Sequence, residues 1–144
     1  IQVVANGGVM GVSSWRAMTG GTGCDCVMLA RGAMGNPWLF DEIQKGSSYR
    51  PPNVENFANE LELHVGEIIG YYGGELGFKL CRKVILDYMR GRGFGGEMKN
   101  RIARLCSHAE LKGFMDELRR GPSDGYWSWL RSNPDVDRRL CLNS

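Results

Sequence analysis

Histidine is scarce in this sequence of 144 residues, which contains only His64 and His108. Cysteine occurs five times, an odd number, with no regular spacing. Cys24 and Cys26 stand closer together than the paired cysteines of ordinary zinc sites, so we expect no structural metal. Scattered thiols in odd number are typical of free cysteines in a reducing compartment, and we therefore expect a cytoplasmic protein.

Long apolar runs are also missing, because none approaches the roughly 20 residues that a membrane-spanning helix needs. We therefore predict no membrane contact. The chain begins at Ile1, without a methionine and already within a strand-like run. We expect from this that the sequence is a piece of a longer protein.

Basic and acidic residues are nearly equal in number, and the formal net charge of +2 excludes no class of partner by itself. Its distribution is uneven, however. Residues 1–45 carry three basic and three acidic residues, whereas residues 79–104 carry eight basic and two acidic ones. The excess of positive charge in the second region indicates an anionic partner.

The first 45 residues have the pattern of one strand, helix, strand unit. Ile1–Ala5 and Asp25–Ala30 are short, apolar runs typical of buried parallel strands. The helix between them is expected to begin with Ser13 as its cap and to close at a glycine pair, and Pro37 is expected to open a further helix. Two strands cannot form a stable sheet alone, so we expect exposed apolar strand faces or self-association.

After a linker at residues 46–53, the sequence predicts an all-α bundle. Residues 54–121 favour three or four antiparallel helices joined by short glycine turns, and Ser107 has the form of a capping residue. The first helix is expected to bury Phe57, Leu61, Val65, Ile68 and Tyr72. The second is expected to bury Cys81, Val84, Ile85 and Tyr88. The fold class is thus an α/β fragment followed by a helical bundle, mostly α overall.

Two glycine-rich turns follow the two predicted strands, Asn6-Gly7-Gly8 and Ala30-Arg31-Gly32. In a (β/α)₈ barrel the loops after the last two strands form the usual phosphate site, and Arg31 is placed to add a charged contact. Glycine allows close approach of backbone N–H groups to an anion. The same glycines are equally compatible with plain tight turns, and spacing alone leaves both readings open.

The basic region is the second candidate site, with Lys79, Arg82, Lys83 and Arg90 on the helical face opposite the apolar one. Clustered lysine and arginine bind nucleic-acid phosphates, whereas a solvated helix face is the alternative. We expect Arg92, Lys99, Arg101 and Arg104 to extend this surface. Tyr71, Tyr72 and Phe94 lie near it in sequence and are candidates for base stacking, although Tyr72 also fits the apolar stripe.

Several runs resemble the tRNA-dihydrouridine synthase family, over most of residues 1–105. In the first part these runs are Val4–Gly8, Thr22–Asp25 and Val27–Phe40. In the second part they are Tyr71–Gly73, Arg82-Lys83, Tyr88 and Gly93. The resemblance implies that residues 1–45 end an FMN-binding (β/α)₈ barrel and that residues 54–144 form a helical tRNA-binding domain.

The resemblance also implies an activity and its residues. Enzymes of this family reduce uridine to dihydrouridine in tRNA, using FMN that NADPH recharges. Their phosphate-binding positions correspond here to Asn6, Gly7, Gly8, Ala30 and Arg31. The family usually has an acidic residue where Gly8 stands, a glycine where Ala30 stands and often a histidine where Val84 stands.

None of the five cysteines matches the family's catalytic cysteine motif, so we expect no catalytic residue here and an inactive chain. Cys81 and Cys106 are expected to lie in the core. The alternatives are a non-catalytic helical RNA-binding module, or part of another phosphate-binding flavin barrel enzyme.

Overall fold

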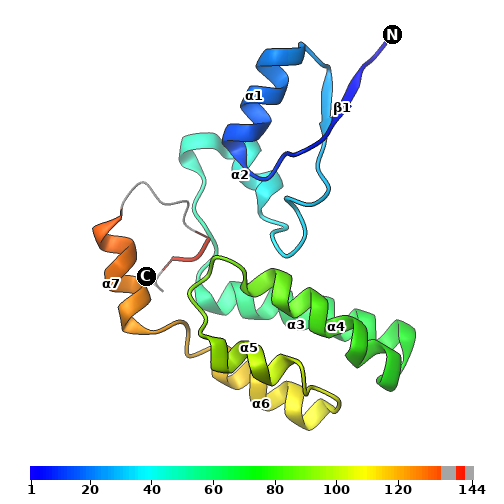
Figure 1. Ribbon diagram of the computed structural model, residues 1–144, viewed down its shortest axis with the longest axis vertical. Helices are drawn as coiled ribbons and strands as arrows, with labels where there is room; N and C mark the ends of the chain where they lie inside the picture. The colour runs from blue at the N-terminus through cyan, green and yellow to red at the C-terminus, as the bar shows by residue number, and fades with distance from the viewer. Residues whose placement is uncertain (134–138, 142–144) are drawn as a thin grey trace. The chain divides into compact units, whose positions relative to one another are not determined.

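A computed structural model describes residues 1–133 and 139–141 of the chain (Figure 1). The chain divides into two compact units, residues 1–50 and residues 51–144. The described residues form seven α-helices, one short 3₁₀ helix and a single two-stranded parallel sheet. The predicted predominance of helix is therefore confirmed.

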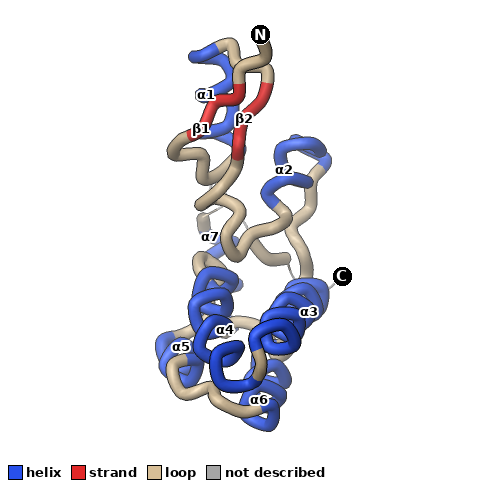
Figure 2. The backbone as a smooth tube through the Cα atoms, turned by 90° about the vertical axis from the view of Figure 1, so that its right-hand side faces the viewer, coloured by secondary structure: helices blue, strands red, loops and turns tan. Residues whose placement is uncertain are grey.

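The first unit contains the strand, helix, strand arrangement that the sequence predicts. Strands β1 (Val4–Asn6) and β2 (Cys26–Met28) pair in parallel, with Ala5 opposite Val27, and they lie side by side in Figure 2. Helix α1 (Val12–Thr22) connects them. Helix α2 (Leu39–Lys45) and the 3₁₀ helix η1 (Gly46–Ser48) follow.

One face of this small sheet is exposed. Val4 is 61 % exposed and Met28 is 54 % exposed. Ala5 and Val27 alternate with these residues along the strands, and both are half-buried on the opposite face. The expectation of exposed apolar strand residues is therefore confirmed for one face of the sheet, and no residue of either strand is fully buried.

The ends of the helices in this unit differ from the prediction. Gly11, not Ser13, is the N-cap of α1, and the Ser14 hydroxyl accepts hydrogen bonds from the N–H groups of Met10 and Gly11. At the third position of the helix, the Ser14 side chain points back to the residues that precede the helix and accepts from their N–H groups, which Ser13 does not. The helix continues to its cap at Gly23, and α2 begins two residues after Pro37.

The second unit is a helical bundle built on an antiparallel hairpin. Helices α3 (Val54–Tyr72) and α4 (Gly74–Met89) meet at Gly73. Their register follows from two contacts: Gly77 packs on Ile69, and the Cys81 thiol donates to the Val65 carbonyl oxygen at 3.6 Å. Residue numbers therefore rise along α4 as those of their contact partners fall along α3, which is the register of an antiparallel pair.

Three further helices complete this unit, α5 (Gly96–Ile102), α6 (His108–Leu118) and α7 (Asp124–Ser132). Helix α5 packs against α4 and α6 packs against α3 (Figure 1). The Ser107 hydroxyl accepts a hydrogen bond from the Glu110 N–H, which confirms the predicted cap. The predicted bundle over residues 54–121 is therefore confirmed, although the connection from α5 to α6 contains no glycine.

The core of the bundle differs from the predicted stripes at three positions, Ile68, Tyr72 and Val84, the last of which is only half-buried. Phe57, Leu61 and Val65 are buried as expected. The stripe then continues through Ile69 instead of Ile68, because the close approach of Gly77 selects that face of the last turns. Tyr72 is 50 % exposed beside the end of the hairpin, so its predicted burial is wrong.

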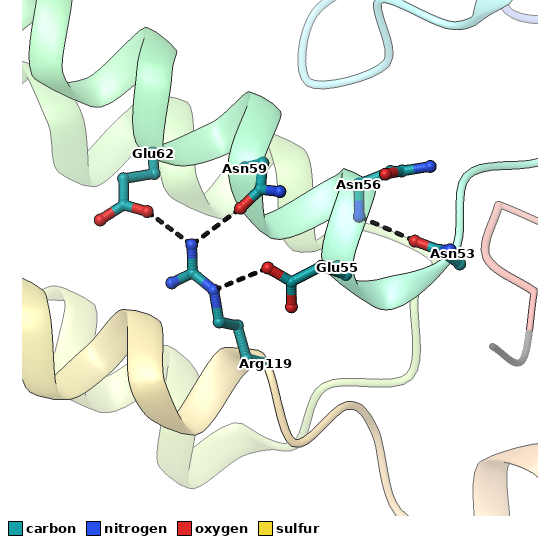
Figure 3. Close-up of polar contacts among 6 residues, drawn as sticks. All are labelled: Asn53, Glu55, Asn56, Asn59, Glu62 and Arg119. Carbon is teal, nitrogen blue, oxygen red and sulfur yellow. Dashed lines mark hydrogen bonds and ion pairs between the residues drawn. The ribbon is translucent and has the colours of Figure 1, made fainter.

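One arginine ties α6 to α3, as Figure 3 shows. Arg119 donates hydrogen bonds to Glu55 at 3.3 Å, to Asn59 at 2.9 Å and to Glu62 at 2.6 Å. These acceptors lie on successive turns of α3, so a single guanidinium spans about two turns. The hydrogen bond that Arg119 donates to Glu62 is the largest cause that raises the pKa of Arg119.

Candidate phosphate pocket and basic surface

The two glycine turns of the first unit line one pocket, with a volume of about 50 Å³. Its lining residues are Asn6, Gly7, Gly8, Val9, Met10, Met28, Ala30 and Arg31. The turns meet because both follow the carboxyl ends of adjacent parallel strands. All five residues proposed from the sequence for a phosphate are therefore brought to one place.

Glycine is required at two points of this arrangement. Gly8 has φ of 58°, a left-handed conformation that glycine adopts without strain. At Gly32 a Cβ atom would lie 2.5 Å from the Val9 carbonyl oxygen, so the second turn packs directly on the first. This contact holds the two turns together, and a larger side chain would force them apart.

The pocket is electrostatically suited to an anion. Arg31 is exposed and has no ion pair among the residues that the structure describes, and no acidic residue lines the pocket. Within the same described residues, the N–H groups of Gly8 and Arg31 donate to no protein acceptor. A phosphate group has the acceptor oxygens and the charge that these donors fit.

The predicted basic surface on α4 is largely paired within the helix. Lys79 contacts Glu75 at 2.8 Å. Lys83 and Arg90 both contact Asp87, each at 2.8 Å. Two cations sharing one carboxylate leave one net positive charge, so the surface is less basic than residue counts indicate.

Arg82 has a different role from its neighbours. Its Nε and Nη2 atoms donate to the Leu105 carbonyl oxygen, at 3.1 Å and 2.9 Å. The guanidinium thereby fixes the backbone that connects α5 to α6. Arg82 is half-buried, and its Nε and Nη2 donors are engaged by the Leu105 carbonyl oxygen.

Two other residues that the sequence assigned to the nucleic-acid surface are internal. Arg92 is fully buried, donates to the Tyr88 carbonyl oxygen and lies 4.9 Å from the ring centroid of Phe57. Phe94 is 5 % exposed and stacks on Phe57. The prediction was wrong for both, because the positive-φ Gly91 and Gly93 turn this segment inward. Tyr71 remains exposed at 83 %.

The sequence also missed a polar pair in the bundle. His64 Nδ1 lies 3.2 Å from the Tyr88 hydroxyl. Burial, followed by the charge of Glu60, raises the pKa of Tyr88 to about 12. Their separation of 24 positions gives no local sequence signal.

The cysteines divide between core and surface. Cys81 is buried as predicted, but Cys106 is exposed on the connection before α6, where its thiol contacts Glu110. Among the described residues no group of histidine, cysteine or carboxylate side chains is arranged to hold a metal. No helix in the described part of the chain has the length and apolarity needed to cross a membrane.

Comparison with known proteins identifies the family. A family model described as dihydrouridine synthase matches residues 1–120. A probable tRNA-dihydrouridine synthase of Mycobacterium leprae is 32 % identical over 122 residues, covering 82 % of this chain and 32 % of that protein. The tRNA-dihydrouridine synthase B of Klebsiella pneumoniae is 35 % identical over 94 residues, covering 62 % of this chain and 29 % of that protein. The chain belongs to the dihydrouridine synthase family.

The chain spans about a third of the length of these relatives. The matched region includes both glycine turns and the helices α3 to α6. Helix α7 lies beyond residue 120, outside the family match.

Proposed function

We propose that this chain is the C-terminal part of a flavin-dependent tRNA-dihydrouridine synthase. Residues 1–45 are the end of its (β/α)₈ barrel, residues 46–53 are a linker, and residues 54–144 are a helical domain that contacts tRNA. The complete cytoplasmic enzyme is an oxidoreductase that reduces uridine to dihydrouridine in tRNA. The observation that carries the proposal is the pocket that Gly8 and Arg31 both line and that no acidic residue lines.

The pocket binds the phosphate of FMN in this proposal. The backbone N–H groups of Gly8 and Arg31 supply donors, the Arg31 guanidinium supplies charge, and Asn6, Gly7 and Ala30 complete the lining around the phosphate. FMN, reduced by NADPH, supplies the hydride chemistry when bound. This chain anchors the cofactor and holds none of the groups that protonate uracil, so alone it is inactive.

The helical unit contacts tRNA phosphates through its basic side chains. Lys83 and Arg90 retain one net positive charge against Asp87, and both are about two-thirds exposed. Lys79 contributes less, because Glu75 neutralises it. Arg82 supports this surface by fixing the backbone at Leu105.

The experiment for the pocket is a titration of the chain with FMN, followed by flavin fluorescence. The variant Arg31→Gln removes the charge and keeps a polar side chain of similar reach. We expect it to weaken FMN binding roughly fivefold, the effect of one charged hydrogen bond at an exposed site. The matched control Arg16→Gln removes a charge in the same unit, outside the pocket, and should change affinity less than about twofold.

Two outcomes would contradict the proposal. If the wild-type chain and Arg31→Gln bind FMN with equal affinity, the two glycine turns do not form a phosphate site and are plain tight turns. A wild-type chain that binds tRNA but no FMN would favour the non-catalytic RNA-binding module.

A further inference from the structure

A second cavity lies in the helical unit, between the end of α5 and α6. It has a volume of about 500 Å³, within the usual range of small-ligand pockets. The residues lining it are Arg101, Arg104, Leu105, Ala109, Glu110 and Gly113. We call it the α5–α6 groove.

Small residues on α6 leave the groove open. Ala109 and Gly113 are one helical turn apart and lie on the same face of α6. A Cβ atom added at Gly113 would meet nothing within 4 Å. Leu105 is 4 % exposed and gives the groove an apolar wall, and Arg82 fixes its carbonyl group.

The groove carries both donors and an acceptor. Arg104 is exposed and has no ion pair among the described residues. Arg101 pairs with Glu117 across the two helices. The pKa of Glu110 is lowered, first by the hydrogen bond from the Cys106 N–H, so its carboxylate is ionised at neutral pH.

We propose that the α5–α6 groove binds one nucleotide of the RNA substrate, an inference that rests on the tRNA binding proposed above. A guanidinium matches a phosphate, and an apolar wall matches a base. An ionised carboxylate accepts from a ribose 2′-hydroxyl or a base amino group, which an entirely basic groove cannot do. The mixed lining of Arg104, Leu105 and Glu110 therefore fits a nucleotide better than a bare phosphate or an acidic peptide.

Two substitutions test the groove by different means. Arg104→Gln removes the unpaired charge at an exposed position. Gly113→Phe fills the groove and leaves every charge in place. Glu110 is not substituted, because its carboxylate also accepts the Cys106 N–H at the start of α6.

Each test variant has a matched control. Arg131→Gln removes an exposed charge on α7, away from the groove. Gly113→Ala adds only a methyl group in open space and raises the helix propensity of α6.

The measurement is tRNA binding to the full chain by fluorescence anisotropy at several salt concentrations. Arg104→Gln should weaken binding roughly fivefold and lower the magnitude of the salt slope by about 0.7 to 0.9. Gly113→Phe should weaken binding to a similar extent with the slope unchanged, because it displaces the nucleotide without removing charge. Both controls should stay within about twofold of the wild-type chain.

The outcomes separate this inference from the proposed function. If the wild-type chain binds tRNA and both groove variants bind equally well, the groove is not the nucleotide site, and tRNA binding elsewhere on the chain stands. If the wild-type chain binds no tRNA, the proposed tRNA contact and the groove proposal both fail. A polyglutamate peptide whose binding depends on Arg104 and Gly113 as strongly as that of tRNA would also overturn the nucleotide assignment.

Discussion

Replacing Arg92 by methionine should destabilise the helical unit strongly. Arg92 is fully buried, and its guanidinium donates to the carbonyl oxygens of Tyr88 and Arg139 and lies over the Phe57 ring. Methionine fills much of the same space but leaves two inward carbonyl groups without these donors. Unmade hydrogen bonds of this kind cost about 1–3 kcal/mol each, and removing the desolvation cost of the charge offsets part of the loss.

The net loss in the free energy of unfolding should be about 3 kcal/mol. For a chain of this size that corresponds to a fall in melting temperature on the order of 10 °C. Urea denaturation followed by far-ultraviolet circular dichroism measures the free-energy change, and differential scanning calorimetry measures the temperature.

Arg90→Met is the matched control, because it makes the same substitution two positions away at a side chain that is 66 % exposed. Exposed ion pairs contribute little, so the control should lose about 0.5 kcal/mol. An Arg92→Met protein as stable as the control, with weakened tRNA binding and a reduced salt slope, would show that Arg92 is a surface residue and that the buried placement is wrong.

Three other changes have defined outcomes. Gly32→Ala should abolish the FMN affinity of the chain while far-ultraviolet dichroism changes little, because its Cβ would meet the Val9 carbonyl at 2.5 Å; unchanged affinity would refute the contact. Arg82→Gln should lower the free energy of unfolding by about 1 kcal/mol in urea denaturation, since the Leu105 carbonyl loses two donors; no loss would indicate a free surface arginine. Tyr88 has its pKa raised to about 12, so stability is retained below pH 10 and falls between about pH 10 and 12; Tyr88→Phe should remove this part of the alkaline loss, and an unchanged pH profile would contradict the assignment.

Local sequence signals predicted the elements of this fold well. Short apolar runs ending in glycine marked both strands, and helical periodicity marked α3, α4 and α6. The capping role of Ser107 was predictable because it depends on a residue three positions away. The pocket lining was predictable for a related reason, since adjacent parallel strands bring their following turns together.

The errors concern residues whose surroundings come from distant parts of the chain. The burial of Arg92 depends on Phe57 and on Arg139, which lies 47 positions away. Charge counting cannot distinguish such an arginine from an exposed one. Arg82 is engaged by a carbonyl 23 positions away, which periodicity does not indicate either.

The ion pairs on α4 could have been predicted from the sequence. Glu75 and Lys79 are four positions apart, as are Lys83 and Asp87, and such spacings place opposite charges together on a helix. Counting these pairs would have predicted a weaker basic surface on α4 and would have favoured Arg104 as a candidate phosphate contact.

The most direct test of the proposed identity compares FMN with riboflavin, which has the same ring system without the phosphate. The backbone amide signals of Gly8 and Arg31 are followed by two-dimensional nuclear magnetic resonance of the ¹⁵N-labelled chain. FMN should shift both signals along one binding curve, and riboflavin should leave them in place. Equal shifts with the two flavins, or no shift with FMN, would contradict a phosphate site in this pocket.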